Sequence, residues 1–229
     1  KYKLCYSPTA IVYHYHGIHQ DGDRERCTNI VKIIESFSEN PISGGSIDPK
    51  KIRINALIPI KGKPVYFDDV PQLKYTIDSA LESTYVDQVF VIADDIETIK
   101  LAQSLGAESP FKRPVSLAKK YVALDAVFQY AVEHLENNGV LSDLIVTLEP
   151  TFPFRSFNLV DDIIEHTLSE GYDSVIAAIR ESGSIWTEDI DNFKRLDSGN
   201  SPRAYKEKTL IGLKGLCCVT HPVFLRSER

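Results

Sequence analysis

The chain has 229 residues, of which 43% are hydrophobic and 25% charged, and its formal net charge is −6. This composition excludes extensive disorder, and the negative charge argues against a general nucleic-acid surface, which needs a basic face. No apolar run approaches the ~20 residues that cross a bilayer. We therefore expect neither a nucleic acid nor a membrane among its partners.

The cysteines and the first residues of the chain bear on its compartment. The start of the sequence lacks the apolar core of a secretory signal. The four cysteines follow neither a zinc-knuckle nor a disulfide spacing, and the adjacent Cys217 and Cys218 lie in an apolar run typical of a buried strand. We expect reduced thiols and a cytoplasmic chain.

A stretch rich in Pro, Gly and Ser divides the sequence at 41–50 and predicts a linker. Before it, residues 1–40 hold a strand-like piece and a helical stretch that are too short to bury a core of their own. After it, residues 51–229 are predicted to form the main domain. Both ends of the sequence look cut, so we expect the C-terminus of that domain to be truncated.

Strands and helices alternate through the main domain. Strands are predicted at 52–60, 89–93, 144–148 and 174–179, and helices at 73–81, 96–102, 119–135 and 159–168. Gly106 is placed to end the second of these helices. Strands without polar alternation are buried on both faces, so the sequence predicts an α/β fold with a doubly wound, mostly parallel sheet and helices on both faces.

Ligands of such sheets bind beyond the carboxyl ends of the strands. Three polar residues lie just past predicted strands at this edge, namely Lys61, Asp94 and Glu149. The sequence therefore predicts a site there.

Five segments resemble one known family. They are residues 56–62, 91–95, 111–118, 148–155 and 215–220. The first is similar to the opening strand and phosphate loop of CMP-sialic acid synthetases, the third to their Arg-Pro-x-x-Leu-Ala segment, and the fourth to Leu-Gln-Pro-Thr-Ser-Pro-Leu-Arg. Because the segments occur in family order, the chain resembles the CMP-sialic acid (acylneuraminate) cytidylyltransferases.

This resemblance implies an activity and its ligands. Members transfer CMP from CTP to a sialic-acid-like (nonulosonic) sugar acid and release pyrophosphate, so CTP and an acidic sugar are the expected partners. Positive charge and usually Mg²⁺ are needed to neutralise the triphosphate during the reaction. The fold implied is that of the nucleotide-diphospho-sugar transferases.

The resemblance also implies nucleotide-binding residues. These are Ile58, Pro59, Lys61, Gly62, Lys63 and Arg113, of which Lys61 and Arg113 are expected to be catalytic. Two alternatives stay open on the residues alone: 61–63 is a solvated turn, and Arg113 is a surface residue before a proline-bounded turn.

Asp94 is the expected Mg²⁺ ligand, because hard cations prefer oxygen and one or two carboxylates suffice. The alternative is that Asp94 or Asp95 caps the helix that follows.

Glu149, Thr151 and Arg155 are expected to bind the sugar. Glu149 stands where the family has a Gln, and an ionised carboxylate accepts hydrogen bonds but donates none. The alternative for Arg155 is that it braces the following helix.

Two departures from the family pattern favour a second function. The phosphate loop is shorter than in the family, and the sequence ends before the family's late pair of aspartates. The alternative function is a catalytically degenerate homologue that binds nucleotide or acts as a scaffold fused to a glycosyltransferase.

The N-terminal segment and a late segment bear on partners. His14, His16 and His19 lie in a stretch that resembles the end of family 2 glycosyltransferases, which implies a fused or associated glycosyltransferase. The sequence leaves the role of these histidines open. Because relatives dimerise, the region 181–193 with Trp186 is expected to form an arm of a homodimer.

Overall fold

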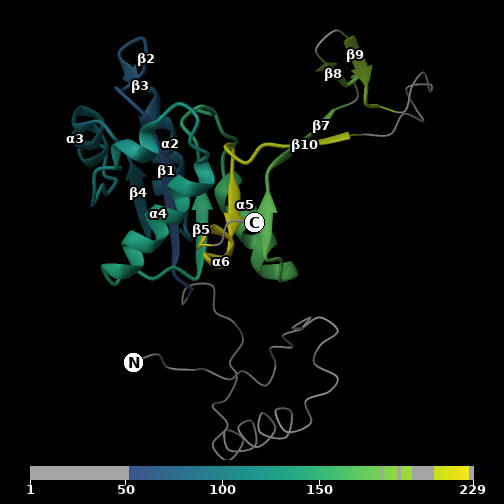
Figure 1. Ribbon diagram of the computed structural model, residues 1–229. Coiled ribbons are helices and arrows are strands. Elements are labelled where there is room, and N and C mark those ends of the chain that lie inside the picture. The colour runs from purple at the N-terminus through teal and green to yellow at the C-terminus, as the bar shows by residue number, and fades with distance from the viewer. Residues whose placement is uncertain (1–51, 182, 190–191, 198–208, 227–229) are drawn as a thin grey trace, which may run out of the picture. The chain divides into compact units, whose positions relative to one another are not determined.

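The computed structural model describes residues 52–181, 183–189, 192–197 and 209–226 (Figure 1). The predictions for residues 1–50, including the histidine segment and the linker, lie outside the described residues and stay predictions.

Five strands form the central sheet. They are β1 (Ile54–Pro59), β4 (Gln88–Ile92), β5 (Leu144–Thr147), β6 (Ser174–Ile176) and β11 (Cys218–Thr220). Their order is β4-β1-β5-β11-β6. β1 pairs in parallel with both β4 and β5, whereas β11 runs antiparallel to β5 and β6. The predicted mostly parallel sheet is thus confirmed, with one reversed strand.

Helices cover both faces of this sheet. They are α2 (Gln72–Leu81), α3 (Ile96–Ser104), α4 (Leu124–Asn137), α5 (Leu159–Glu170) and α6 (Val223–Arg226). On one face, α2, α3 and α5 pack on alternate strand residues such as Ile58 and Val91. On the other, α4 packs on Leu57 and Phe90, and Leu225 of α6 joins the edge of that cluster.

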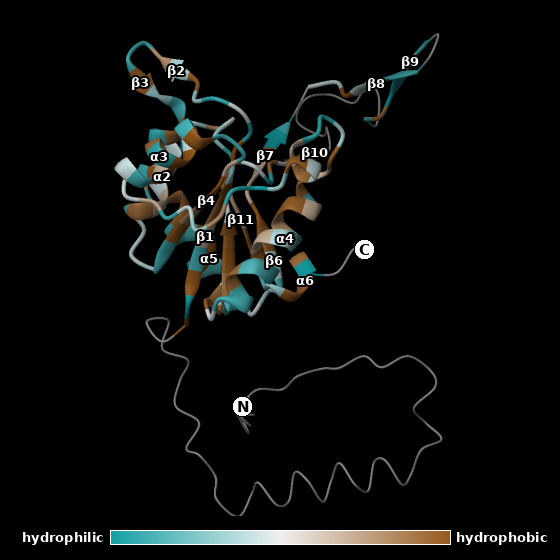
Figure 2. Ribbon diagram, turned by 60° about the vertical axis from the view of Figure 1, so that its left-hand side comes forward, coloured by the Kyte–Doolittle hydropathy of each residue, from teal (hydrophilic) through white to brown (hydrophobic). Residues whose placement is uncertain are grey.

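Strands β1, β4, β5 and β11 belong to the core because nearly all of their side chains are buried, whereas β6 at the edge of the sheet is more exposed. All six residues of β1 are buried, and β4 and β5 follow the same pattern. Figure 2 shows the matching hydrophobic colour of the central strands. Burial on both faces is what the continuous apolar runs predict, so the fold expected from the sequence is confirmed.

Three small antiparallel pairs stand outside the central sheet. β2 (Tyr66–Phe67) pairs with β3 (Val70–Pro71), β7 (Ala178–Glu181) with β10 (Thr209–Gly212), and β8 (Trp186–Asp189) with β9 (Asn192–Arg195). The last two pairs cover much of the segment expected to form an arm.

Two predicted boundaries are wrong. The helix expected from residue 119 begins at Leu124, after a short 3₁₀ helix at Val115–Ala118, because its buried face begins only at Val127. The strand expected at 174–179 is divided at Ala177, where the chain leaves the central sheet to pair with β10.

The expected end of a helix at Gly106 and the expected burial of the adjacent cysteines are confirmed. Gly106 follows the end of α3 with a φ of +93°, a conformation that glycine adopts without strain. Cys217 and Cys218 are free and buried. Within the described part of the chain, no helix has the length and apolarity to span a membrane.

Candidate active site at the carboxyl edge of the sheet

The turn after β1 is fixed by the strand and helix that follow. The amide of Ile60 donates to the carbonyl of Ile92 at 3.1 Å, which extends the β1–β4 pairing by one bond. Gly62, with a φ of +76°, turns the chain there. Its amide donates to Oδ1 of Asp94 at 2.8 Å, and its carbonyl accepts from the Thr98 hydroxyl at 2.8 Å. Hydrogen bonds therefore hold the turn at both the amide and the carbonyl of Gly62.

Asp94 and Asp95 have separate tasks, although they are adjacent. Oδ2 of Asp95 accepts from the amide of Thr98 at 3.0 Å and so caps α3. That hydrogen bond from the Thr98 amide is the main cause that lowers the pKa of Asp95. Asp94 points instead toward Gly62 and Arg113. The helix cap is thus Asp95, and Asp94 remains the candidate for the ligand site.

Arg113 lies beneath this turn. Its side chain is only 3% exposed, and its amide donates to the carbonyl of Ala93 at 2.8 Å. The guanidinium forms an ion pair with Oδ1 of Asp94 at 3.3 Å, and its Nε is buried with no hydrogen-bond partner among the described residues. The alternative of a surface arginine is wrong, because burial places this charge under the site.

The other predicted nucleotide residues divide by exposure. Ile58 and Pro59 are buried in β1, so their side chains belong to the core. Lys61 and Lys63 are exposed. Lys63 approaches Glu97 at 3.4 Å with both side chains largely in solvent, where such a pair holds weakly. Both ammonium groups are therefore free to move to an anion.

A metal ion would find one carboxylate at this turn. Within the described ranges, no group of three or more His, Cys, Asp or Glu side chains is arranged to hold a metal. Oδ1 of Asp94 is occupied by Gly62 and Arg113. A Mg²⁺ ion that keeps several waters and binds phosphate oxygens needs only one or two carboxylates, so Oδ2 of Asp94 fits as a single ligand.

Of two pockets that bear on the predicted residues, the larger lies over β5, β11 and β6. Its volume is about 660 Å³, and its walls come from the first turns of α4, the end of β5, the two neighbouring strands, and α6. Glu149 and Lys214 both line it. β1 and β5 are neighbours in the sheet, although β4 lies between them in the sequence. The boundary between β1 and β5 is therefore a topological switch point, where ligands of such sheets bind. The pocket shares β5 with this boundary.

Arg155 braces the backbone of this pocket. Its Nε donates to the carbonyl of Leu216 at 2.7 Å, and its NH2 group donates to the carbonyls of Glu149 at 2.9 Å and Gly215 at 3.2 Å. NH1 donates to the Thr76 hydroxyl at 3.0 Å. Burial lowers the pKa of Arg155 to about 10. Arg155 joins the turn after β5 to the turn before β11, and does not brace the helix that follows it.

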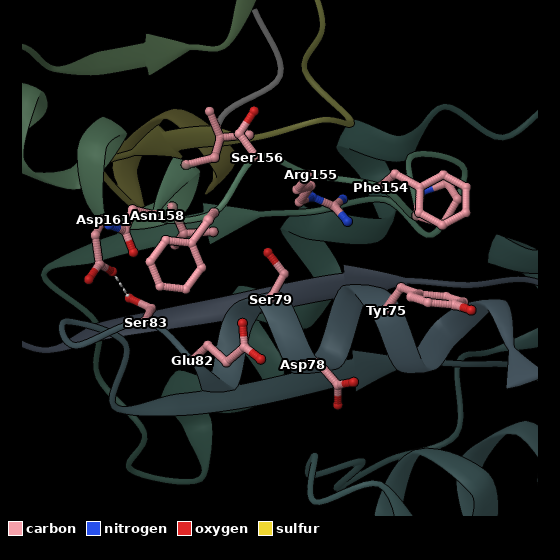
Figure 3. Close-up of a pocket in the computed structure, with 14 residues that line it drawn as sticks. Tyr75, Asp78, Ser79, Glu82, Ser83, Phe154, Arg155, Ser156, Asn158 and Asp161 are labelled. Carbon is pink, nitrogen blue, oxygen red and sulfur yellow. Dashed lines mark hydrogen bonds between the residues drawn. The ribbon is translucent and has the colours of Figure 1, made fainter.

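The three predicted sugar residues do not share one pocket. Thr151 is exposed and donates to Oε2 of Glu149 at 3.3 Å. Arg155 lines a second pocket of about 320 Å³ between α2 and the loop before α5 (Figure 3). There, Tyr75, Asp78 and Glu82 project from α2 opposite that loop, and Asp161 accepts from the Ser83 hydroxyl.

Sequence reasoning missed Lys214. It lies in the turn before β11 and lines the larger pocket. Its position directly before Gly215, where a segment matched to the family begins, is the signal that could have identified it. The reversed direction of β11 brings this turn to the carboxyl edge of β5, which the local sequence does not reveal.

The chain was compared with known proteins. No family model matches it. Over 125 residues, it is 32% identical to a pseudaminic acid cytidylyltransferase of Campylobacter jejuni, a match that covers 55% of this chain and 50% of the relative. Over 156 residues, it is 27% identical to N-acylneuraminate cytidylyltransferase A of Danio rerio, which covers 63% of this chain and 35% of that protein. The chain is a homologue of the CMP-sialic acid cytidylyltransferases.

The sequence relatives and the solved structures support different conclusions. The chain spans about half the length of the Campylobacter relative. A CMP:2-keto-3-deoxy-manno-octonic acid synthetase complexed with CTP matches with a TM-score of 0.54 at 14% identity, over 76% of each chain. A 4-diphosphocytidyl-2C-methyl-D-erythritol synthase matches with a TM-score of 0.56 at 13% identity, over 75% of this chain and 76% of that one. At such identities, the structural matches establish the fold alone.

Proposed function

We propose that the chain is a cytidylyltransferase that transfers CMP from CTP to a sialic-acid-like (nonulosonic) sugar acid and releases pyrophosphate. The observation that carries this proposal is the turn at 61–63, which Asp94 and Thr98 hold at the carboxyl end of β1. Its similarity to cytidylyltransferases of acidic sugars supports the choice of nucleotide and acceptor.

In this proposal, the turn receives the triphosphate. Lys61 and Lys63 donate to phosphate oxygens, and the main chain of Ile58 and Pro59 lies under the nucleotide. Arg113 supplies positive charge from beneath, through its contact with Asp94. The sugar hydroxyl attacks the α-phosphorus and loses its proton to water, the bond to the bridging oxygen breaks, and pyrophosphate leaves with that oxygen. Fixed positive groups stabilise the charge that develops during such a transfer.

We expect Mg²⁺ to take part, with Oδ2 of Asp94 as its protein ligand and phosphates and waters as the others. The ion would neutralise charge on the triphosphate. The residues of the chain orient the nucleotide around it.

The larger pocket is the proposed place of the sugar acid. β5, which bounds it, pairs with β1, the strand that leads to the turn at 61–63. Glu149 lines it at the end of β5, Thr151 donates to the carboxylate of Glu149, and Arg155 holds the main chain of Glu149. The residues predicted for the sugar thus contribute in two ways, by contact and by support.

The nucleotide preference tests this function. Calorimetry with CTP, UTP and ATP in the presence of Mg²⁺ should give the lowest dissociation constant for CTP. Pyrophosphate release should then require both CTP and a nonulosonic acid. A CTP preference without pyrophosphate release would instead identify the degenerate nucleotide-binding homologue, and equal affinities for all three nucleotides would remove the proposal.

We also propose a homodimer. Trp186 and Phe193, on the β8–β9 pair, are 55% and 66% exposed, and Leu210 on β10 is 65% exposed. Large apolar side chains at such exposure favour burial against another chain. Light scattering should give twice the mass of the chain, and Trp186→Glu with Phe193→Glu should reduce it to one mass.

The remaining expectations concern cellular context. We expect the chain to act in the cytoplasm, where CTP is available and the free thiols of Cys217 and Cys218 stay reduced. A fused or associated glycosyltransferase, expected from residues 1–40, would use the CMP-sugar. Co-purification from the native source tests that partner.

A further inference from the structure

Charged side chains of both signs line the larger pocket. Lys214 contributes an ammonium group from the turn before β11, Glu149 a carboxylate from the end of β5, and Asp125 a second carboxylate from the first turn of α4. In the described part of the chain, no ion pair joins Lys214 to either carboxylate. The ammonium group and the two carboxylates therefore line the pocket without forming ion pairs with one another.

The backbone holds Glu149 and Lys214 in place. The amide of Glu149 donates to the carbonyl of Gly215 at 2.7 Å, next to Lys214, and Arg155 bridges the same two turns. A Cβ atom at Gly215 would lie 2.6 Å from Oε1 of Glu149, which is closer than such atoms approach. Only glycine at this position lets the carboxylate lie against the turn that carries Lys214.

The carboxylate of Glu149 keeps room for a further donor. Its Oε2 accepts from the Thr151 hydroxyl at 3.3 Å. The described hydrogen bonds of Arg155 go to Thr76 and to main-chain carbonyls, so the arginine acts on this carboxylate through space. A carboxylate can only accept hydrogen bonds, so the ligand atom opposite Glu149 must be a donor.

The charge of the ligand follows from the charges of the pocket. An acidic sugar brings one carboxylate, which Lys214 can hold as the cation of the lining. Arg155 offsets the charge of Glu149 only through space, and no described cation forms an ion pair with Asp125, so an acceptor with only neutral substituents gives neither carboxylate a direct cationic partner. A positively charged donor gains more from a carboxylate in such a partly enclosed place than a neutral donor does.

We propose that Glu149 and Lys214 together select a zwitterionic sugar acid as the acceptor. The sugar carboxylate pairs with Lys214, and an amino or amidino substituent donates to Glu149. This inference rests on the proposed function, because it concerns the acceptor of that reaction.

The test compares two acceptors that differ in one group, a nonulosonic acid with a free amino substituent and its N-acetylated form. Calorimetry near neutral pH, with a CTP analogue whose α,β-bridge is methylene, gives both dissociation constants without turnover. We expect the amino form to bind about tenfold or more tightly to the unaltered chain. Glu149→Gln should bring the two constants within about threefold of each other, because the amide has no charge.

Two further variants separate the role of Lys214 from that of Glu149. Lys214→Gln should weaken both acceptors to a similar degree and leave their ratio unchanged, because both carry the carboxylate. Asp162→Asn, on α5 outside the pocket, should change neither constant. Urea unfolding checks that Glu149→Gln folds, which we expect since Gly215 and Arg155 bond to the main chain of this residue.

Equal binding of the two acceptors to the unaltered chain, or a ratio that survives Glu149→Gln, would overturn the inference. Pyrophosphate release from CTP with either acceptor decides the proposed function separately. An active chain without acceptor preference would therefore refute the zwitterion alone.

Discussion

The main-chain amide of Gly62 donates to the carboxylate of Asp94 across 2.8 Å, which ties the turn after β1 to the end of β4. The same oxygen accepts from Arg113, whose side chain is almost fully buried. One carboxylate thus sets the position of the exposed lysines on either side of Gly62. We expect the site at this edge to depend on that contact.

Asp94→Ala should loosen the turn, whereas Asp95→Ala should not. Loss of Asp94 leaves the Gly62 amide and the buried Arg113 without their acceptor, and we expect the free energy of unfolding to fall by about 2 kcal/mol. Loss of the Asp95 cap should cost about 1 kcal/mol. CTP affinity should fall about tenfold in the first variant and stay unchanged in the second, as calorimetry and urea unfolding would measure. Equal CTP affinities in the two variants would show that Asp94 does not organise the site.

Lys61→Ala should weaken the binding of the triphosphate. Because the ammonium group is exposed beside the held turn, its loss should raise the dissociation constant of CTP about tenfold, with a smaller effect on CMP, which has fewer phosphates. Lys100→Ala, an exposed lysine in α3, is the control and should change neither constant. An unchanged CTP affinity in Lys61→Ala would remove this lysine from the site.

The sequence predicts most of the fold because the strands of the sheet have a strong local signal. The apolar run of β1 is buried along its whole length. Boundaries that depend on distant partners are not visible locally. The division at Ala177 is one case, because the amide of Ala177 donates to the carbonyl of Cys217, and its carbonyl accepts from Leu213.

The candidate site was predictable in part. Strand ends placed Lys61, Asp94 and Glu149 at one edge, as the parallel pairs of β1 with β4 and β5 confirm. The burial of Arg113 and the bracing role of Arg155 depend on packing between segments far apart in the chain. Lys214 reaches the pocket only because β11 is reversed. Contacts between segments far apart in the chain leave no periodic pattern or motif in the sequence.

Arg155→Ala tests whether this arginine supports the pocket or contacts the sugar. Removing it takes one donor away from each of three main-chain carbonyls and from the Thr76 hydroxyl, so the free energy of unfolding should fall by about 3 kcal/mol. Urea unfolding measures this loss. Arg155→Lys should recover only part of it, since an ammonium group cannot reproduce the planar set of donors. A variant of normal stability with weaker sugar binding would instead make Arg155 a ligand-contacting residue.

The buried thiol of Cys217 should make stability depend on alkaline pH. Burial raises its pKa from 9.0 to about 12. The folded state therefore keeps the proton where the unfolded state loses it, so this stabilisation is complete below about pH 9 and is lost as the pH rises toward 12. Between about pH 8 and about pH 10.5, the free energy of unfolding should fall by about 1–2 kcal/mol more in the unaltered chain than in Cys217→Ala.

Urea unfolding at several pH values measures that difference. Thr220→Val is the control, because it changes a buried side chain of β11 without a titrating group and should lower stability equally at every pH. Other alkaline titrations, such as that of Tyr85, are common to all three proteins and cancel in the comparison. If Cys217→Ala loses stability with pH as steeply as the unaltered chain, the thiol is accessible to water, and the core at the start of β11 is more open than its packing indicates.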